Sequence, residues 1–156
     1  MDHIAIAEIT FLKENIDEKT MNGIDVGCGA RKTLSHAIGV DVARMEETDF
    51  SAGATTEAEW VGNGHELPFK DNTLDYVLSR HVLEHMDWQL ALQEWMRCLK
   101  TKGIMRIVVP DPNHPHHIGH GLNAQEVANF LLTLNAQSIK TESLCNAYSW
   151  GLACTK

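Results

Sequence analysis

The sequence contains no long apolar run. None of its runs approaches the roughly 18 residues that a membrane-spanning helix needs, although hydrophobic residues make up 44% of the 156 residues. The opening residues Met1 to Ile4 place no basic segment before an apolar one, so we expect no signal peptide. The length suits one hydrophobic core. We therefore expect a single compact domain over residues 1–156, located in the cytoplasm and without membrane contact.

Cysteine is scarce, and its spacing argues against two kinds of site. The cysteines lie far apart and form no Cys-x-x-Cys pair. This spacing argues against a structural zinc site and against a disulfide framework. Scattered cysteines are typical of a reducing compartment. They are Cys28, Cys98, Cys145 and Cys154.

Lysine and arginine form no stripe, and the formal net charge is -8. Nucleic acid is therefore a poor first expectation for a partner, although a local basic patch can exist within an acidic total. The chain also shows no internal repeat and no low-complexity segment.

What the sequence does contain is an alternation of short apolar strands and amphipathic helices. Leu92, Trp95, Met96 and Leu99 recur at helical spacing, which predicts the clearest helix over residues 88–100, ended by Gly103. We expect further helices over 4–15 and 124–134, and the start of a helical region over 81–86. The expected strands are 23–26, 38–42, 59–62, 74–79, 104–109, 138–145 and 149–155.

The last two expected strands, 138–145 and 149–155, are joined by only a short turn. Two strands with so little between them must pair antiparallel. We therefore expect an α/β, Rossmann-like, doubly wound fold with a mostly parallel seven-stranded sheet and an antiparallel last strand. Residues 1–22 would form an N-terminal helix and a linker, residues 43–57 mostly loop, and 30–36 no full crossover helix.

A glycine turn follows the first expected strand. Residues 23–29 read Gly-Ile-Asp-Val-Gly-Cys-Gly, and such a turn at the end of a parallel strand is where α/β sheets bind nucleotide-like ligands. The third glycine of a dinucleotide fingerprint would stand at Lys32, which argues against a nicotinamide-dependent oxidoreductase. An adenosyl sulfonium ligand has no phosphates, and its ribose diol needs an acid at the end of the next strand. Asp41 stands there, where it could also merely cap a following turn.

Five blocks of sequence, in this order, carry a resemblance to a known family. They are residues 24–29, 39–42, 62–75, 81–85 and 97–103. In them the chain resembles class I S-adenosylmethionine-dependent methyltransferases, within the methyltransferase-11-type domains. The resemblance implies S-adenosyl-L-methionine as cofactor and transfer of its methyl group to an acceptor that the sequence does not identify.

The resemblance also implies which residues contact the cofactor. Gly27 and Gly29 would line its methionine and ribose portion, Asp41 would hold the ribose, and Gly64 would offer its N–H to adenine. Asn63 stands where many members have an acid that contacts adenine, and an amide oxygen can accept the same hydrogen bond. Asn63-Gly64 is also a common turn dipeptide. The full set is Asp25, Gly27, Cys28, Gly29, Asp41, Val42, Asn63, Gly64, Ser79 and Arg80, the last two near the methionine end.

Residues 81–85, His-Val-Leu-Glu-His, match the inverted zinc-peptidase pattern. Zinc would need both histidines on one face of an established helix, whereas this segment follows a buried strand directly. The same letters are common in the methyltransferase family, where they hold no metal. We therefore expect no metal here, and we keep His81 as a candidate contact to cofactor or substrate.

A second group of histidines fills the loop at 113–121, after the fifth expected strand. The loop should lie at the rim of the sheet, where such folds place their substrates. Three interpretations stay open: a role toward substrate, a solvated loop, or a metal site. If one side chain is a general base, His117 and His120 are equal candidates. The group comprises His114, His116, His117 and His120.

Two functions therefore compete. The first is an active methyltransferase, and the second is a non-catalytic S-adenosylmethionine-binding module that acts with a partner. The chain leaves little sequence for a substrate cover, and three alternatives stay open: a shallow site for a large acceptor, a cover from a second copy of the chain, or a partner protein that completes the substrate site. The sequence does not identify the acceptor.

Overall fold

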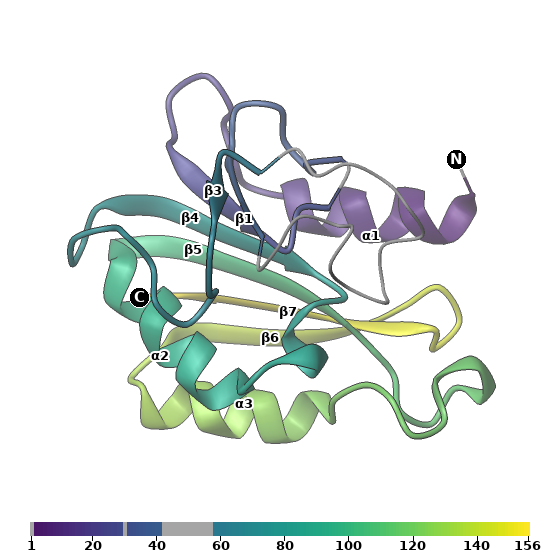
Figure 1. The fold of residues 1–156 in the computed structure, drawn as a ribbon. Coiled ribbons are helices and arrows are strands. Elements are labelled where there is room, and N and C mark those ends of the chain that lie inside the picture. Colours follow the sequence, from purple (N-terminus) through teal and green to yellow (C-terminus); the bar gives the residue numbers. More distant parts are fainter. Residues whose placement is uncertain (1, 30, 42–57) are drawn as a thin grey trace.

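The computed structural model describes residues 2–29, 31–41 and 58–156. They form one seven-stranded sheet in the order β3-β2-β1-β4-β5-β7-β6 (Figure 1). Strands β1 to β5 pair in parallel, and β7 pairs antiparallel with both β5 and β6. The expected mixed sheet is thus confirmed. The strands are β1 Gly23–Val26, β2 Ile38–Asp41, β3 Trp60–Val61, β4 Leu74–Arg80, β5 Leu99–Pro110, β6 Gln137–Leu144 and β7 Ser149–Thr155.

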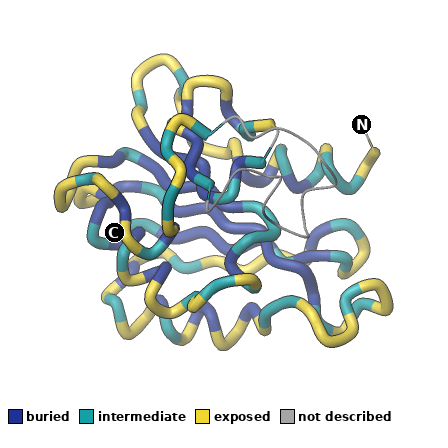
Figure 2. Tube along the Cα trace, in the orientation of Figure 1, coloured by how far each residue is buried: buried dark blue, intermediate teal, exposed yellow. Residues whose placement is uncertain are grey.

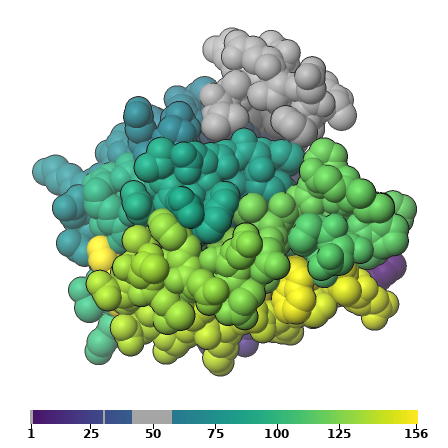
Figure 3. All heavy atoms as spheres, turned by 90° about the horizontal axis from the view of Figure 1, so that it is seen from below, coloured from purple at the N-terminus to yellow at the C-terminus, as the bar shows by residue number. Residues whose placement is uncertain are grey.

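Helices cover both faces of this sheet. Helix α1, His3–Lys13, lies on one face, and α2, Trp88–Cys98, and α3, Ala124–Thr133, lie on the other (Figure 1). Figure 3 looks onto the face that α2 and α3 cover. Two short 3₁₀ turns follow the ends of β4 and β5, at Leu83–His85 and Pro115–His117. Residues 31–37, between β1 and β2, contain no helix, as expected. No helix among the described residues is long and apolar enough to cross a membrane.

Each helix begins at a side chain that caps its free backbone N–H groups. Asp2 accepts from Ala5 N at 2.7 Å, and Asp87 accepts from Leu90 N at 3.2 Å. Asn123 does the same for α3 through the backbone of the first turn. These three caps explain why the helices begin where they do.

The central strands are buried on both faces, which Figure 2 shows in dark blue. Their side chains alternate between the two faces of the sheet. Tyr76 and Leu78 of β4 face the side of α1, whereas Val77 joins the larger core beneath α2 and α3. Within that core Trp95 is fully buried, together with Ala91, Leu92 and Met96 from the same helix.

Helix α1 is fixed to the sheet by buried charges near its middle and at its end. At its end, the Arg106 side chain of β5 donates through Nε to Phe11 O at 2.6 Å and through Nη2 to Glu14 Oε2 at 2.7 Å. The guanidinium also lies 4.2 Å from the centre of the Phe11 ring. In the middle, Glu8 bonds to the ends of β4 and β7, as described below.

The predicted boundary between the helix at 88–100 and the strand at 104–109 was wrong. The helix was expected over 88–100 with Gly103 as its end, but α2 ends at Cys98 and β5 begins at Leu99. Leu99 continues the apolar spacing of the helix, yet it pairs with Leu74, and Thr73 N donates to Cys98 O at 2.8 Å. Strand pairing therefore prevails over helical periodicity at this position. The helical region expected over 81–86 shrinks to the 3₁₀ turn, and residues 42–57 lie outside the described residues.

Candidate functional site

The glycine turn lies at the carboxyl end of β1, as the sequence predicts. Gly27 has a φ of +72° and Gly29 a φ of +55°, both in the left-handed region that favours glycine. A Cβ at Gly27 would lie 2.0 Å from Val82 Cγ2, so no side chain fits there. Gly27 N donates to Val40 O at 2.7 Å, which holds the turn against β2.

Asp41 ends β2 and faces this turn. Its Oδ2 accepts from Gly29 N at 3.0 Å, and its backbone oxygen accepts from Gly62 N at 2.8 Å. One residue therefore connects the glycine turn with the segment that follows β3. Val42, also a predicted cofactor contact, lies outside the described residues.

Asp25 of β1 is 2% exposed and accepts from Thr33 N at 2.6 Å. Burial raises its pKa to about 6, against the hydrogen bonds of Thr33 and the charges of Lys32 and Arg80. A cavity of about 100 Å³ opens beside this carboxyl. It is lined by Ile9, Asp25, Gly27, Cys28, Arg31, Lys32, Thr33 and Arg80.

Lys32 binds the segment before β3 to the turn. Its Nζ donates to Glu59 Oε1 at 2.5 Å, and Glu59 Oε2 accepts from Gly39 N at 2.5 Å. The residue that breaks the dinucleotide fingerprint thus has a structural contact of its own. No sequence pattern indicated Glu59 as its partner.

Asn63 and Gly64 follow β3 on the same edge of the sheet. Asn63 is exposed and Gly64 is buried, with its backbone oxygen bonded to Trp95 Nε1 at 2.8 Å. A Cβ at Gly64 would lie 2.8 Å from Met86 Cε. Helix α2 therefore fixes the position of this dipeptide from below.

The end of β4 supplies two of the predicted residues. Ser79 is fully buried, and its Oγ has no hydrogen-bond partner within the described residues. Arg80 points to the other face, where its Nε donates to Glu8 Oε2 at 2.7 Å. His81 follows with a φ of +54°, and its Nε2 lies 2.8 Å from Glu8 Oε1.

Glu8 is the functional candidate that the sequence prediction did not identify. It is fully buried in α1 and also accepts from Ser149 Oγ at 2.8 Å. Burial opposes its ionisation, but the hydrogen bonds and charge of His81, with the bonds from Arg80 and Ser149, outweigh it and lower the pKa. The available signal was a carboxylate on the apolar face of a helix.

Of the histidines in the loop after β5, His117 has its ring near that of His81. The ring of His117 lies 4.4 Å from that of Tyr148 and 6.4 Å from that of His81, measured between centroids. Burial lowers the pKa of His117, and the neighbouring histidines lower it further. His114 packs on the same tyrosine at 5.1 Å, whereas His120 is exposed. The rings of His81 and His117 are therefore neighbours, whereas the His120 side chain is exposed and only its backbone N–H bonds to His117 O, at 2.7 Å.

The zinc-peptidase pattern does not form a shared helical face. His81 precedes the 3₁₀ turn and binds Glu8, while His85 Nε2 lies 3.5 Å from Glu84 Oε1. Among the described residues, no group of three histidine, cysteine, aspartate or glutamate side chains is placed to hold a metal ion.

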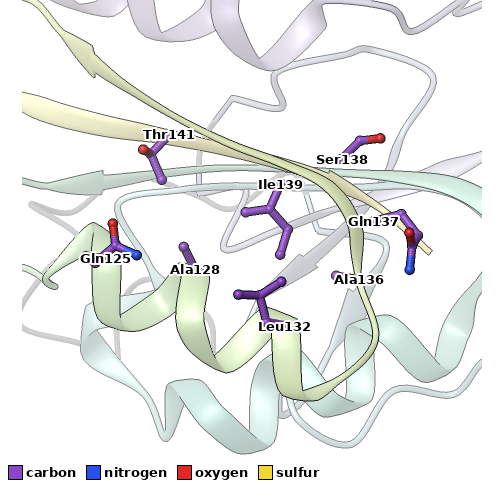
Figure 4. A pocket seen from close by; sticks show the side chains of 8 residues that line it. All are labelled: Gln125, Ala128, Leu132, Ala136, Gln137, Ser138, Ile139 and Thr141. Carbon is purple, nitrogen blue, oxygen red and sulfur yellow. The ribbon is translucent and has the colours of Figure 1, made fainter.

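A groove of about 410 Å³ lies at the other end of the sheet, between α3 and the edge strand β6 (Figure 4). Its lining has no acid, base or nucleophilic cysteine, which leaves it without groups for catalysis. The lining residues are Gln125, Ala128, Leu132, Ala136, Gln137, Ser138, Ile139 and Thr141.

A family model for a methyltransferase domain matches residues 24–107, more than half of the chain. The match contains the glycine turn, Asp41 and the end of β4. The chain belongs to the class I S-adenosylmethionine-dependent methyltransferases. Membership in this methyltransferase family confirms the resemblance that the five sequence blocks indicated.

Curated relatives of this chain are longer proteins. A demethylmenaquinone methyltransferase of Bacillus pumilus is 31% identical over 119 residues, which cover 65% of this chain and 50% of the relative. An uncharacterized protein of Methanocaldococcus jannaschii is 33% identical over 111 residues, which cover 69% of this chain and 49% of the relative. The chain thus spans about half the length of the curated relatives it matches.

Solved methyltransferase structures share the fold at low sequence identity. A methyltransferase of Thermotoga maritima superposes with a TM-score of 0.74 at 16% identity, over 97% of this chain and 88% of the other. The Haemonchus contortus phosphoethanolamine N-methyltransferase 2 in complex with S-adenosylmethionine gives 0.71 at 15%, over 96% and 52%. A Haloferax volcanii methyltransferase bound to the activator Trm112 gives 0.71 at 15%, over 98% and 88%.

Proposed function

We propose that this chain binds S-adenosyl-L-methionine across the carboxyl ends of β1 and β2 and transfers its methyl group to an acceptor approaching from the ends of β4 and β5 and the start of β7. The observation that carries the proposal is the bond of 3.0 Å from Gly29 N to the Asp41 carboxylate. It brings the glycine turn and a diol-binding acid together at the edge where α/β sheets bind their ligands. The proposal treats residues 1–156 as one domain, with 1–22 as helix and linker.

Two features of the described residues fit this cofactor. Gly27, at the end of β1, lines the cavity beside Asp25. The space where Gly27 and Gly64 would carry a Cβ is filled by Val82 and Met86, so neither position accepts a side chain. Ser79 lies beside the end of β1, since it pairs with Val26 in the sheet. Its buried Oγ makes no hydrogen bond within the described residues. A ligand group at this edge could satisfy it.

We assign the cofactor contacts accordingly. Gly27 and Gly29 would face the methionine and ribose portion, and Asp41 would accept the ribose hydroxyls. Asn63 and Gly64 would contact adenine. The remaining predicted residues, Asp25, Cys28, Ser79 and Arg80, would surround the methionine end, and Val42 is included on the family resemblance alone.

The bound cofactor supplies an electrophilic methyl group on a sulfonium. The protein's contribution is to align the acceptor with that methyl group and to exclude water. Of the three histidine candidates, we favour His81, because it lies at the end of β4 with its ring held by Glu8. His117 packs beside it, and the exposed His120 has the least support.

A second subunit or a partner protein would complete the acceptor side. Ile118, in the loop after β5, is 75% exposed, and Ile6 of α1 is 52% exposed. The Haloferax volcanii neighbour, which works with an activator, offers a precedent for such a partner. We also place the protein in the cytoplasm, because its four cysteines form no disulfide. Light scattering of the purified chain would give its oligomeric state.

Calorimetric titration with S-adenosylhomocysteine, S-adenosylmethionine and NAD tests the cofactor assignment. Asp41→Ala should weaken S-adenosylhomocysteine binding by about 1–3 kcal/mol, because the ribose hydroxyls lose their acceptor. Asp17→Ala, at an exposed acid in the turn after α1, is the matched control and should leave the affinity unchanged. Binding of NAD without any binding of S-adenosylhomocysteine would overturn the proposal.

An acceptor screen separates the enzyme from a non-catalytic module. The chain is incubated with S-adenosylmethionine and panels of phenols, amines and carbon acids, and release of S-adenosylhomocysteine is measured. An active methyltransferase releases it with at least one class. Tight cofactor binding without release on any panel, alone or with cell extract, would favour the module.

A further inference from the structure

Glu8 connects three parts of the proposed acceptor edge. Its Oε1 lies 2.8 Å from His81 Nε2 and 2.8 Å from Ser149 Oγ, and its Oε2 lies 2.7 Å from Arg80 Nε. These partners come from the end of β4, the residue after it and the start of β7. A fully buried carboxylate normally has a structural role, but one of these partners is a partly exposed imidazole at the proposed acceptor side.

His81 is held in one orientation by two independent constraints. Its φ of +54° is a conformation that side-chain-bearing residues rarely adopt, and its backbone N–H donates to Val108 O at 2.9 Å. Its Nε2 is fixed by Glu8. The side chain is nevertheless 28% exposed, and Nδ1 makes no hydrogen bond to the described residues. The ring therefore offers one nitrogen to the protein and the other to whatever occupies the edge.

We propose that Glu8 is the positioning residue of a carboxylate–imidazole pair, in which Glu8 holds Nε2–H of His81 and His81 presents Nδ1 as the general base for the methyl acceptor. This inference rests on the proposed function of the site. It also defines the acceptor class as a group that loses a proton when it is methylated, such as a hydroxyl, a phenol, a protonated amine or a carbon acid.

The proton transfer balances as follows. The acceptor atom forms its bond to the methyl carbon while the carbon–sulfur bond breaks, and the electron pair of that bond stays on sulfur. The acceptor's proton moves to Nδ1 of His81, which then carries protons on both nitrogens. The Glu8 carboxylate stabilises this imidazolium through Nε2–H, and the proton later leaves to water.

The charges around His81 suit this role. Glu8 and Arg80 balance each other while His81 is neutral, so protonation adds one positive charge to a neutral group. Glu84, whose pKa is raised by burial, lies in the 3₁₀ turn after β4, and His117 and Tyr148 face the ring from the loop after β5 and the turn before β7. Among these groups Arg80 is the only permanent cation, and Glu8 already binds it. Glu8 itself stays ionised, because its pKa is lowered.

The test uses the whole chain labelled with ¹⁵N-histidine, with the His81 ring signals assigned from their absence in His81→Asn. Ring signals are followed against pH, with and without S-adenosylhomocysteine. In Glu8→Gln the midpoint of the His81 titration should move to lower pH, because the side chain keeps its size but loses its charge. Glu14→Gln, which removes the ion pair with Arg106 at 2.7 Å just after the same helix, should leave the midpoint unchanged.

Each outcome separates the two hypotheses. If wild-type chain fails to bind S-adenosylhomocysteine by calorimetry, the proposed function fails. If wild type and Glu8→Gln bind S-adenosylhomocysteine equally and the His81 midpoint does not move in Glu8→Gln, only the role of Glu8 is overturned. Should Glu8→Gln unfold, Ser149→Ala removes one donor from the same oxygen, Oε1, and should move the midpoint to higher pH, because the charge of Glu8 is then shared with one donor fewer. An unchanged midpoint would overturn the role of Glu8.

With an acceptor from the screen, a kinetic arm adds a second readout. Glu8→Gln should lower kcat by about 10- to 1000-fold at neutral pH, with KM for S-adenosylmethionine changed less than about threefold. The acid limb of the pH–rate profile should move to lower pH. A loss confined to KM, with an unchanged pH profile, would assign Glu8 a purely structural role.

Discussion

Asp25→Asn separates the cost of burying a charge from the value of the hydrogen bond that Asp25 makes. The carboxyl is buried, and its pKa is raised to about 6 from an ordinary value of 3.8. A carboxyl whose pKa is higher in the folded state contributes stability that is fully present below the unfolded value and is lost as pH rises through the folded value. The folded chain therefore becomes less stable, on account of this residue, between about pH 4 and 7.

The linkage relation gives the size of the effect. With pKa values of 3.8 and about 6, ionisation of Asp25 costs about 1.6 kcal/mol near pH 5 and about 3 kcal/mol near pH 7.5. Asn has nearly the same shape, does not titrate, and its amide oxygen can still accept from Thr33 N. The stability of Asp25→Asn relative to wild type should therefore rise by about 1.4 kcal/mol between those two pH values.

Urea denaturation followed by tryptophan fluorescence measures this difference at each pH. Only its change with pH matters, because a packing penalty of the amide would be the same at both. Asp17→Asn, at an exposed carboxyl, serves as the control for the general effect of replacing an acid by its amide. If the Asp25→Asn difference stays constant from pH 5 to 7.5, the raised pKa and its cause in burial are refuted.

Two further predictions concern the backbone of the proposed cofactor site. Gly27→Ala should lose about 2 to 4 kcal/mol of stability, because it combines a φ of +72° with a Cβ 2.0 Å from Val82. Gly119→Ala is the control for backbone strain alone, because Gly119 has a φ of +81° and no atom within 4 Å of the added Cβ. This control should lose about 1 kcal/mol. Equal losses in the two variants, in urea denaturation, would contradict the close contact. Trp95→Phe should lose about 1–3 kcal/mol and weaken S-adenosylhomocysteine binding, since it leaves the buried Gly64 oxygen without its donor. Trp88→Phe, at a tryptophan packed on Phe130, is the control, and an unchanged affinity in Trp95→Phe would separate Gly64 from the adenine site.

The sequence predicts the elements of this fold well, because each carries its signal locally. The glycine turn and the stripe of Leu92, Trp95 and Met96 need no tertiary information. The end of α2 is different, because Leu99 satisfies both a helical stripe and a strand, and only its pairing with Leu74 decides between them. The end of the helix thus depends on a residue about 25 positions away, and the local periodicity of the sequence carries no information about that pairing.

The candidate site divides in the same way. The facing of Gly29 and Asp41 follows from adjacent parallel strands, so the sequence could predict it. The partners of Glu8 could not be predicted, because Arg80 and Ser149 reach it from distant segments. Nor could the sequence choose between His117 and His120, since a short loop carries both and only its path brings one toward Tyr148.

The bond between Ser149 and Glu8 also has a consequence for the order in which the molecule assembles. It joins residues 141 positions apart, whereas the bond between Gly29 and Asp41 closes a loop of 12. Closing the longer loop costs about 2 kcal/mol more in chain entropy. Because the entropy of loop closure must be overcome before a long-range contact can form, we expect the bond between Gly29 and Asp41 to form earlier in folding than the bond between Ser149 and Glu8. The acceptor half would then become ordered only once the last hairpin of the chain has met its first helix.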